Sequence, residues 1–257
     1  MNLIKYARNR YSQSGEDGII EEIFTRLKIS SGWFVEFGAW DGKYLSNTYN
    51  LLAHHGWQGV YIEGNPEKYR ALLETSATFP GKVHPLCAMV GFEGDNTLDH
   101  LLARTPIPKD FALLSIDIDS YDWQVWKALQ MYKPKLVIIE SNCSIAPGIY
   151  SIHNPPVSEG ASFTALVQLG KEKGYSLVCH TGNCFFVLNE LVSSLNIEPA
   201  LLATPEKQFN HAKYRKERLI VLARKLLPPG LVGAIFKYRD RRREAAKNIA
   251  RQKEFAG

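Results

Sequence analysis

The sequence predicts an α/β fold: a doubly wound, mostly parallel sheet of seven strands with a helical, basic C-terminal extension. The first observation is that short, continuous apolar runs alternate with helical patterns five times, which is typical of βα units around a parallel sheet. The second is that the last two runs, at 175–180 and 183–188, are separated only by Thr181-Gly182, the spacing of a hairpin. The sheet should therefore end with an antiparallel strand.

The strands are expected at the apolar runs, and the helices are marked by their own start or stop signals. Strands are predicted at 33–35, 59–62, 83–89, 111–117, 135–140, 175–180 and 183–188. Helices are predicted at 11–27, from 46 onward, from 66 onward, and at 97–102, 121–131 and 161–173. Apolar residues at helical spacing mark the first helix, Pro66 takes the first position of the third, and Gly174 closes the last.

The alternation of strands and helices stops at Leu191, so we expect a catalytic domain at 1–190 and a helical extension at 191–257. Of the 31 Lys and Arg residues, 15 follow Ala203, against 5 of the 26 Asp and Glu residues. The extension is therefore strongly basic. Such a tail suits an anionic lipid surface, a lipid-linked glycan or a nucleic acid, and a solvated appendage is the equal alternative. Helices are predicted in it at 219–227 and 239–253.

Hydropathy and cysteine content indicate a cytoplasmic protein. No apolar stretch of the 257 residues has the length of a membrane span, and the first residues lack the apolar core of a signal peptide. The four cysteines contain no C-x-x-C pair, which argues against a zinc site or a disulfide framework. We expect them to be reduced and mostly buried.

The stretch Trp33–Gly42 has the features of a nucleoside-binding loop. An apolar strand runs into Glu36 and Gly38 and is followed by a helix start, so backbone N–H groups can approach a ligand closely. The next strand ends in Glu63, where a carboxylate can accept hydrogen bonds from both hydroxyls of a ribose. The two strands together predict a nucleoside-cofactor site.

The acidic character of this loop favours a cationic cofactor. The dinucleotide pattern G-x-G-x-x-G is absent, and Glu36 and Asp41 would repel a pyrophosphate. S-adenosylmethionine combines an adenosine with a sulfonium and an ammonium, so it suits both the acidic loop and Glu63. The alternative is an ordinary strand-to-helix turn in another α/β protein.

Further cofactor contacts are expected where strands end and helices begin. In an open α/β sheet, ligands bind beyond the carboxyl ends of the strands, and Ala88 and Asp117 stand at two such ends. Ser46 and Asn47 start a helix and could receive the cofactor's carboxylate, although helix capping explains them equally well. Gln13, near the start of the first helix, is a weaker candidate, because polar and acidic residues there usually complement the helix dipole.

Asp117 and its neighbours form the expected catalytic centre. Asp117 ends the fourth strand, and Asp119 follows two residues later. Glu140 and Asn142 lie at the end of the fifth strand. Oxygen ligands from two adjacent strand ends could hold Mg²⁺ or another divalent cation at Asp119, Glu140 and Asn142, and a nearby carboxylate could take the substrate proton. The alternative is that these carboxylates cap the helices that follow. His153, in the loop after the fifth strand, could be a base or a substrate contact, with a plain surface histidine as the alternative.

Together these motifs resemble the class I S-adenosylmethionine-dependent methyltransferases and, within them, the FkbM-like family. The resemblance spans Tyr11 to Leu188 and rests on the segments 12–18, 35–39, 45–48, 56–66, 97–99 and 114–119. It implies cofactor contacts at Glu36, Gly38, Glu63 and Asp117. It also implies O-methylation of natural products or glycans.

The Asp117-x-Asp119-x-Tyr121 spacing also resembles the macrocin O-methyltransferase group. That resemblance implies that the first aspartate is the base and that the second binds a metal with an Asp pair after the next strand. Glu140 and Ser141 take the pair positions here, so the serine departs from the pattern and Asn142 becomes its replacement.

Three functions follow as hypotheses. The first is an O-methyltransferase that acts on a hydroxyl, or on a carboxylate, of a small molecule, natural product or saccharide. The second is an RNA methyltransferase that uses the basic tail, with nucleic acid the less favoured partner. The third is a non-catalytic adaptor or peripheral membrane protein that uses the segment 219–237. Assembly into a homo-oligomer stays open.

Overall fold

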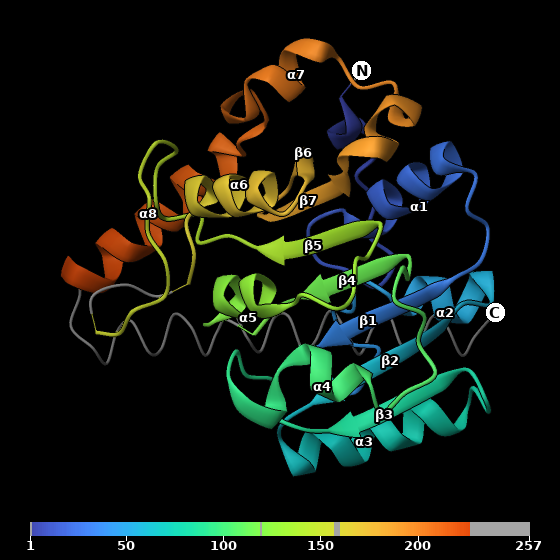
Figure 1. The fold of residues 1–257 in the computed structure, drawn as a ribbon. Coiled ribbons are helices and arrows are strands. Elements are labelled where there is room, and N and C mark those ends of the chain that lie inside the picture. The colour runs from blue at the N-terminus through green and yellow to red at the C-terminus, as the bar shows by residue number, and fades with distance from the viewer. Residues whose placement is uncertain (1, 119, 157–159, 227–257) are drawn as a thin grey trace, which may run out of the picture. The chain divides into compact units, whose positions relative to one another are not determined.

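The computed structural model of the chain describes residues 2–118, 120–156 and 160–226 and contains one seven-stranded sheet (Figure 1). The strand order is β3-β2-β1-β4-β5-β7-β6, and β7 runs antiparallel to both of its neighbours. The strands are β1 (Trp33–Phe37), β2 (Gln58–Glu63), β3 (Val83–Cys87), β4 (Leu113–Ile116), β5 (Leu136–Glu140), β6 (Tyr175–His180) and β7 (Asn183–Leu188). The predicted doubly wound sheet and its terminal hairpin are confirmed.

Helices cover the two faces of the sheet. The α-helices are α1 (Glu16–Leu27), α2 (Tyr49–His55), α3 (Pro66–Ala77), α4 (Leu98–Leu102), α5 (Asp122–Ala128), α6 (Phe163–Glu172), α7 (Pro199–Ala203) and α8 (His211–Leu226). The 3-10 helices are η1 (Leu3–Tyr6), η2 (Gly94–Asn96), η3 (Asn189–Leu195) and η4 (Pro205–Gln208). Side chains alternate between the faces along each strand: Leu136 and Ile138 of β5 join the core formed with α1, α2 and α3, whereas the buried Val137 and Ile139 do not.

The first helix begins later than its hydrophobic pattern predicts. α1 starts at Glu16 instead of near Tyr11, and Gly15 before it has a left-handed backbone with φ 95°. An α-helix cannot continue through a left-handed residue, so the segment before Gly15 forms a loop in which the N–H groups of Arg10 and Tyr11 bind the side chain of Asp17. The predicted start at residue 11 was wrong.

The chain divides into two compact units, Met1–His211 and Ala212–Gly257. The predicted boundary after residue 190 thus falls inside the first unit. Leu195 and Ile197 are buried in the core of this unit, and Gln208 Nε2 donates to the carbonyl of Leu177 in β6 at 3.0 Å. These segments lack strand or helix periodicity, which is why the sequence pattern separates them from the sheet.

Other expectations concern the C-terminal helices, membrane spans and cysteines. The helix predicted at 219–227 corresponds to the longer α8, and the one predicted at 239–253 lies outside the described residues. In the described ranges, no helix is both long and apolar enough to cross a membrane. None of the four cysteines, which all lie in the described ranges, forms a disulfide: Cys87 is exposed, and Cys143, Cys179 and Cys184 are buried.

Candidate active site

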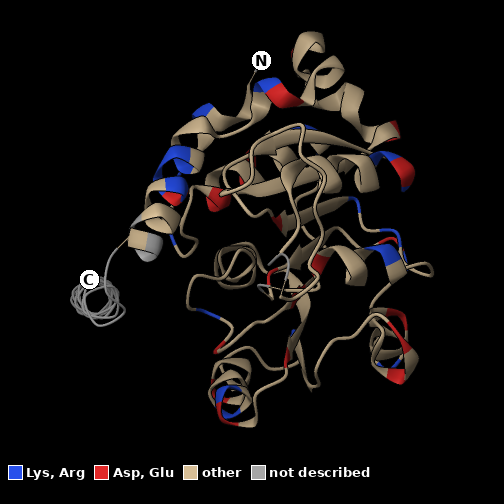
Figure 2. Cartoon of the chain, turned by 90° about the vertical axis from the view of Figure 1, so that its left-hand side faces the viewer, with Lys and Arg blue, Asp and Glu red and all other residues tan. Residues whose placement is uncertain are grey.

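The candidate site lies at the edge of the sheet where the five parallel strands β1–β5 end. Their arrowheads in Figure 1 point to the same side, and Figure 2 views the molecule from that side. Glu36, Glu63 and Glu140 occupy the last or next-to-last positions of β1, β2 and β5. Ala88 and Asp117 directly follow β3 and β4, and the Ala88 N–H donates to the Glu63 carbonyl at 3.2 Å. The five strand-end positions singled out in the sequence therefore share one edge.

The Glu36 carboxylate holds the loop that leads into α2. Its Oε2 accepts hydrogen bonds from Ser46 Oγ at 2.5 Å and Thr48 Oγ1 at 2.6 Å. Its Oε1 accepts the backbone N–H of Asn47 at 2.9 Å, and the residue is only 7% exposed. The sequence predicts a cofactor contact for Glu36, whereas in the structure both oxygens serve the residue's own loop.

Ser46 and Asn47, two further predicted cofactor contacts, also bind within the protein. Ser46 Oγ accepts the backbone N–H groups of Thr48 at 3.1 Å and Tyr49 at 2.9 Å, so it caps the start of α2. Asn47 Nδ2 donates to Ser115 Oγ of β4 at 3.1 Å. Helix capping therefore accounts for Ser46, and Asn47 ties the loop to the neighbouring strand.

Burial raises the pKa of Glu36 above 4.5. Loss of solvation is the largest cause, the hydrogen bonds from the loop oppose it, and the negative charge of Asp17 adds to it. Burial also raises the pKa of Tyr61 well above its ordinary value, with the charge of Glu36 as the second cause. The Tyr61 hydroxyl lies 3.0 Å from Thr48 Oγ1. Glu36 thus belongs to a buried polar cluster that positions the loop.

Gly38 allows the ends of β1 and β4 to meet. It has a left-handed backbone with φ 72°, and a Cβ atom added there would lie 2.2 Å from the carbonyl oxygen of Asp117. No side chain fits at that distance. The loop after β1 is therefore held directly against the residue predicted to be the catalytic base, and Asp117 itself is half-buried.

Glu63 is as buried as Glu36 but makes fewer contacts. It is 6% exposed, its Oε2 accepts the backbone N–H of Trp40 at 2.8 Å, and its Oε1 accepts that of Asn65 at 2.7 Å. Because each oxygen of an ionised carboxylate has about two acceptor positions, one position per oxygen is left for a ligand. The two N–H groups fix the orientation of the carboxylate.

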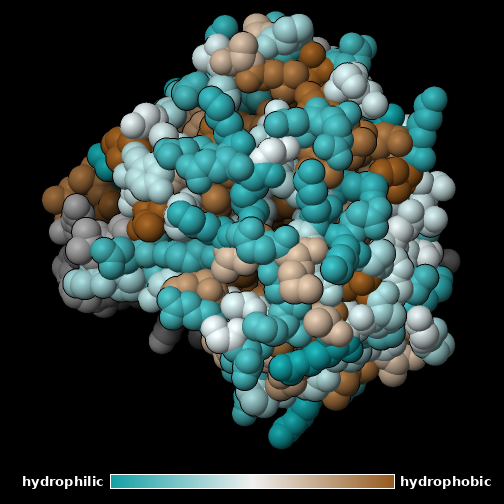
Figure 3. All heavy atoms as spheres, viewed as in Figure 1, coloured by the Kyte–Doolittle hydropathy of each residue, from teal (hydrophilic) through white to brown (hydrophobic). Residues whose placement is uncertain are grey.

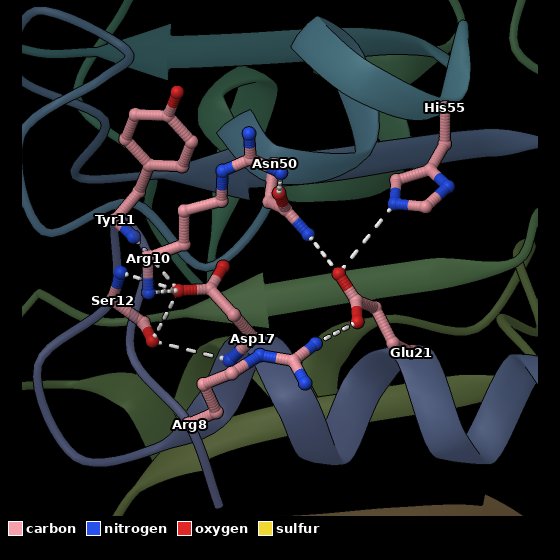
Figure 4. Close-up of polar contacts among 8 residues, drawn as sticks. All are labelled: Arg8, Arg10, Tyr11, Ser12, Asp17, Glu21, Asn50 and His55. Atoms are coloured by element: carbon pink, nitrogen blue, oxygen red, sulfur yellow. Dashed lines mark hydrogen bonds and ion pairs between the residues drawn. The ribbon is translucent and has the colours of Figure 1, made fainter. Parts of the chain in front are cut away.

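Asp17 is a buried carboxylate near the start of α1, where acidic residues usually complement the helix dipole. It is 1% exposed, and its Oδ2 accepts the backbone N–H groups of Arg10, Tyr11 and Ser12, each at 2.8 Å (Figure 4). Its Oδ1 is also buried but has no hydrogen-bond partner in the described part of the chain. A buried, unpaired carboxylate oxygen is costly, so it requires a water molecule or a cationic group.

Gln13 and Glu16, three residues apart near the start of α1, differ in exposure. Gln13, a predicted cofactor contact, is exposed. Glu16 is fully buried, and its Oε1 accepts hydrogen bonds from Thr181 Oγ1 at 2.8 Å and Asn183 Nδ2 at 3.1 Å. The acidic side chains at the start of α1 thus point inward. The hydrogen bond from Asn183 joins this end of α1 to β7, and no local sequence pattern predicts such a long-range contact.

A second network, also visible in Figure 4, joins α1 to α2. Glu21 accepts a hydrogen bond from Asn50 Nδ2 at 2.6 Å and forms an ion pair with Arg8. Its Oε1 lies 3.5 Å from His55 Nε2. The partners of Glu21 come from α2 and from the loop before α1, so the network holds this loop in place.

Of the three predicted metal ligands, the structure describes Glu140 and Asn142. Asp119 lies outside the described residues. Asn142 Oδ1 accepts hydrogen bonds from the backbone N–H of Ser144 at 2.9 Å and from its Oγ at 2.6 Å, so this oxygen caps a turn. Glu140 is half-buried at the end of β5. Within 2–118, 120–156 and 160–226, no three His, Cys, Asp or Glu residues are grouped so that they could hold a metal ion.

His153 lies in an aromatic row formed by the loops after β3, β4 and β5. Its ring is 4.5 Å from that of Tyr121, which in turn is 5.2 Å from Phe92. The backbone N–H of Gly160 donates to His153 Nδ1 at 3.0 Å. In the neutral ring the proton is therefore on Nε2, so His153 can donate a hydrogen bond to a ligand but has no free basic nitrogen. The role of His153 as a base or a substrate contact stays a prediction.

Comparisons with known proteins give structural likenesses only. No protein-family model matches the sequence, and no curated protein matches it. Among solved structures, an O-methyltransferase family protein from Burkholderia thailandensis matches with a TM-score of 0.42 and 13% identity, over 67% of this chain and 57% of that one. This chain thus spans less than two thirds of that protein.

Two further solved structures match over more of their own length. M. capricolum TrmK, in complex with S-adenosyl-homocysteine, matches over 88% of this chain and 96% of that one, with 10% identity and a TM-score of 0.43. A putative RNA methyltransferase from Pyrococcus horikoshii matches over 71% and 88%, with 11% identity and a TM-score of 0.41. The strand order with its antiparallel β7 is itself that of the class I methyltransferase fold.

Proposed function

We propose that the protein is an S-adenosylmethionine-dependent methyltransferase that methylates an oxygen of a small molecule, natural product or saccharide. The observation that carries the proposal is Glu63, a buried, oriented carboxylate at the end of β2 with one acceptor position left on each oxygen. Its place in the fold is where a ribose is held. Membership of the FkbM-like family is part of the proposal and rests on the sequence motifs.

Glu63 fits the adenosine part of the cofactor. A ribose presents two neighbouring hydroxyl groups, and the two free acceptor positions of Glu63 match them. The backbone N–H groups of Trp40 and Asn65 keep the carboxylate from rotating, so little conformational freedom is lost on binding. Ala88, which is hydrogen-bonded to the end of β2, lies beside this position.

Asp17 and Glu36 fit the charge of the cofactor's amino-acid part. Asp17 Oδ1 is buried without a partner among the described residues, and an ammonium group would supply one. Asp17 is close enough to Glu36 for its charge to raise the Glu36 pKa, so this corner of the site is negative. A cationic ligand is favoured over a phosphate there, and Glu36 contributes by its charge and by positioning the loop.

Asp117 is the proposed general base. When bound, the cofactor supplies a methyl group on a positively charged sulfur. Asp117 takes the proton of the acceptor hydroxyl as the new carbon–oxygen bond forms and the carbon–sulfur bond breaks, giving a methyl ether and S-adenosylhomocysteine. The close approach of the Asp117 backbone to Gly38 supports this assignment.

The aromatic row suits the acceptor. Phe92 and Tyr121 are 36% and 38% exposed, so they offer apolar ring faces at the edge of the site. Tyr121 and His153 add polar groups beside these faces, and His153 Nε2 is a donor for an acceptor oxygen. A ring-shaped acceptor with hydroxyl groups, such as a saccharide or polyketide-like natural product, matches this combination.

The test is transfer of labelled methyl from S-adenosylmethionine to a panel of hydroxyl-bearing acceptors. Asp117→Asn should lower turnover by about 100-fold or more while cofactor affinity stays within about tenfold, because only the proton transfer is lost. Asp110→Asn, the same change at the exposed amino end of β4, is the matched control and should leave turnover unchanged. Absence of cofactor binding in calorimetry would overturn the proposal.

A divalent ion held by Asp119, Glu140 and Asn142 stays a prediction, and the same assay tests it. Parallel reactions with EDTA and with added Mg²⁺ distinguish a reaction that needs a metal ion from one that does not. If the ion orients the acceptor hydroxyl, EDTA lowers turnover and Mg²⁺ restores it. Equal turnover in both would assign activation of the hydroxyl to Asp117 alone.

A further inference from the structure

α8 carries three strongly exposed leucines on one face. Leu219, Leu222 and Leu226 are 67%, 52% and 72% exposed. Their spacing of three and four residues places them one above another along the helix. Single exposed leucines are common, but a row of three over two turns leaves an apolar stripe that needs a partner. In Figure 3, which has the view of Figure 1, hydrophobic surface is visible on α8.

The same face also carries positive charge. Arg215 and Arg218 are exposed and precede Leu219 and Leu222 by four residues, so each arginine lies one turn from a leucine. Lys and Arg recur along α8 in Figure 2, and Glu217 is the only acidic residue of the helix sequence. A partner for this face must therefore have an apolar interior that can bury the leucines and an anionic surface that can bind the arginines.

The sequence that follows α8 has the same two properties. No charged residue occurs from Leu226 to Phe236, a stretch far shorter than the roughly 20 residues needed to span a bilayer. From Lys237 to Gly257 there are 8 Lys and Arg against 3 Asp and Glu. This alternation of basic and apolar segments is typical of chains that lie in a membrane interface.

We propose that α8 binds the surface of an anionic membrane, with the stripe of Leu219, Leu222 and Leu226 at the acyl boundary and Arg215 and Arg218 at the lipid phosphates. Arginine suits this position because its planar head group binds phosphate while its stem remains in apolar surroundings. RNA is the less suitable partner, because a single-stranded nucleic acid offers bases for aromatic stacking and leaves exposed leucines unburied. The inference is independent of the proposed function.

The test is co-sedimentation of the full chain with phosphatidylglycerol-containing vesicles and with pure phosphatidylcholine vesicles. We expect binding to the anionic vesicles and little to the neutral ones. Arg215→Gln combined with Arg218→Gln should weaken binding about 25-fold, since each basic residue near such a surface contributes about fivefold. Leu219→Ser combined with Leu222→Ser should weaken it by at least about tenfold through lost apolar burial.

Matched controls use α3, where Leu73 is 43% exposed and Arg70 is exposed as well. Leu73→Ser and Arg70→Gln should leave vesicle binding as in the wild type. The wild type should also keep part of its binding at high salt, because leucine burial is not screened. Unchanged binding of the leucine variant would overturn the proposal. So would binding to single-stranded RNA, with a steep salt dependence, in a chain that does not bind vesicles.

Discussion

Glu36 and Glu63 stand at the ends of adjacent strands and are about equally buried, yet they differ in their hydrogen-bond partners. Glu36 accepts two hydroxyl groups and one backbone N–H from the loop at 46–48. Glu63 accepts one backbone N–H on each oxygen. The loop therefore fills three of the roughly four acceptor positions of the first carboxylate, whereas the second keeps one position for a ligand on each oxygen. Burial and residue type are the same for the two glutamates. Their hydrogen-bond partners distinguish the carboxylate that positions the loop from the one proposed to bind a ligand.

Removal of the Glu36 carboxylate should give the largest loss of stability. Glu36→Ala leaves Ser46, Thr48 and the Asn47 N–H without their acceptor in a buried place, so the free energy of unfolding should fall by about 3 kcal/mol or more. Urea unfolding measures this change. Glu63→Ala removes the acceptor of only two backbone N–H groups and should cost less. If Glu36→Ala and Glu63→Ala lower the free energy of unfolding equally, the two carboxylates do not differ in how they support the fold.

The approach of β1 to β4 can be tested at Gly38. Gly38→Ala adds both backbone strain and a contact at 2.2 Å with the Asp117 carbonyl, and we expect a loss of about 2–3 kcal/mol. Gly94→Ala is the matched control, since Gly94 also has a positive φ but no heavy atom of the described chain within 4 Å of the added Cβ. It should cost only about 1–2 kcal/mol. If the two variants unfold at the same urea concentration, the strand ends are not in contact.

Ligand affinity should depend on Glu63, whereas stability should depend more strongly on Glu36. Glu63→Ala should weaken S-adenosylhomocysteine binding about tenfold to 100-fold in calorimetry, since two hydrogen bonds to a charged acceptor are lost. Glu74→Ala, at an exposed position of α3, should bind like the wild type. Unaltered affinity of the Glu63 variant would mean that the ribose is held elsewhere.

The smallest expected effect is a pH dependence that comes from Glu36. Because its folded-state pKa is above 4.5, the unfolded chain releases this proton first as pH rises, and the wild type loses stability between pH 4.5 and the raised value. Glu36→Gln has no such proton. The wild-type free energy of unfolding minus that of the variant should therefore fall as pH rises through this window. If urea titrations give the same pH dependence of the free energy of unfolding for the wild type and Glu36→Gln, the pKa of Glu36 is not raised.

The strand ends could be predicted from the sequence because strand periodicity and the rule for open α/β sheets are local and general. Glu63 and Asp117 were identified in this way. The partners of Glu36 depend on how the loop folds back over ten residues, and the inward turn of Asp17 depends on a loop without periodicity. Residues 191–211 likewise join the first unit through contacts that only the folded chain creates.

A crystal structure with S-adenosylhomocysteine tests the central distinction most directly. The account predicts that both ribose hydroxyls lie within hydrogen-bond distance of the Glu63 carboxylate, while Glu36 still binds Ser46 and Thr48. A ribose bound away from Glu63, or a Glu36 side chain turned from its loop to the ligand, would contradict it.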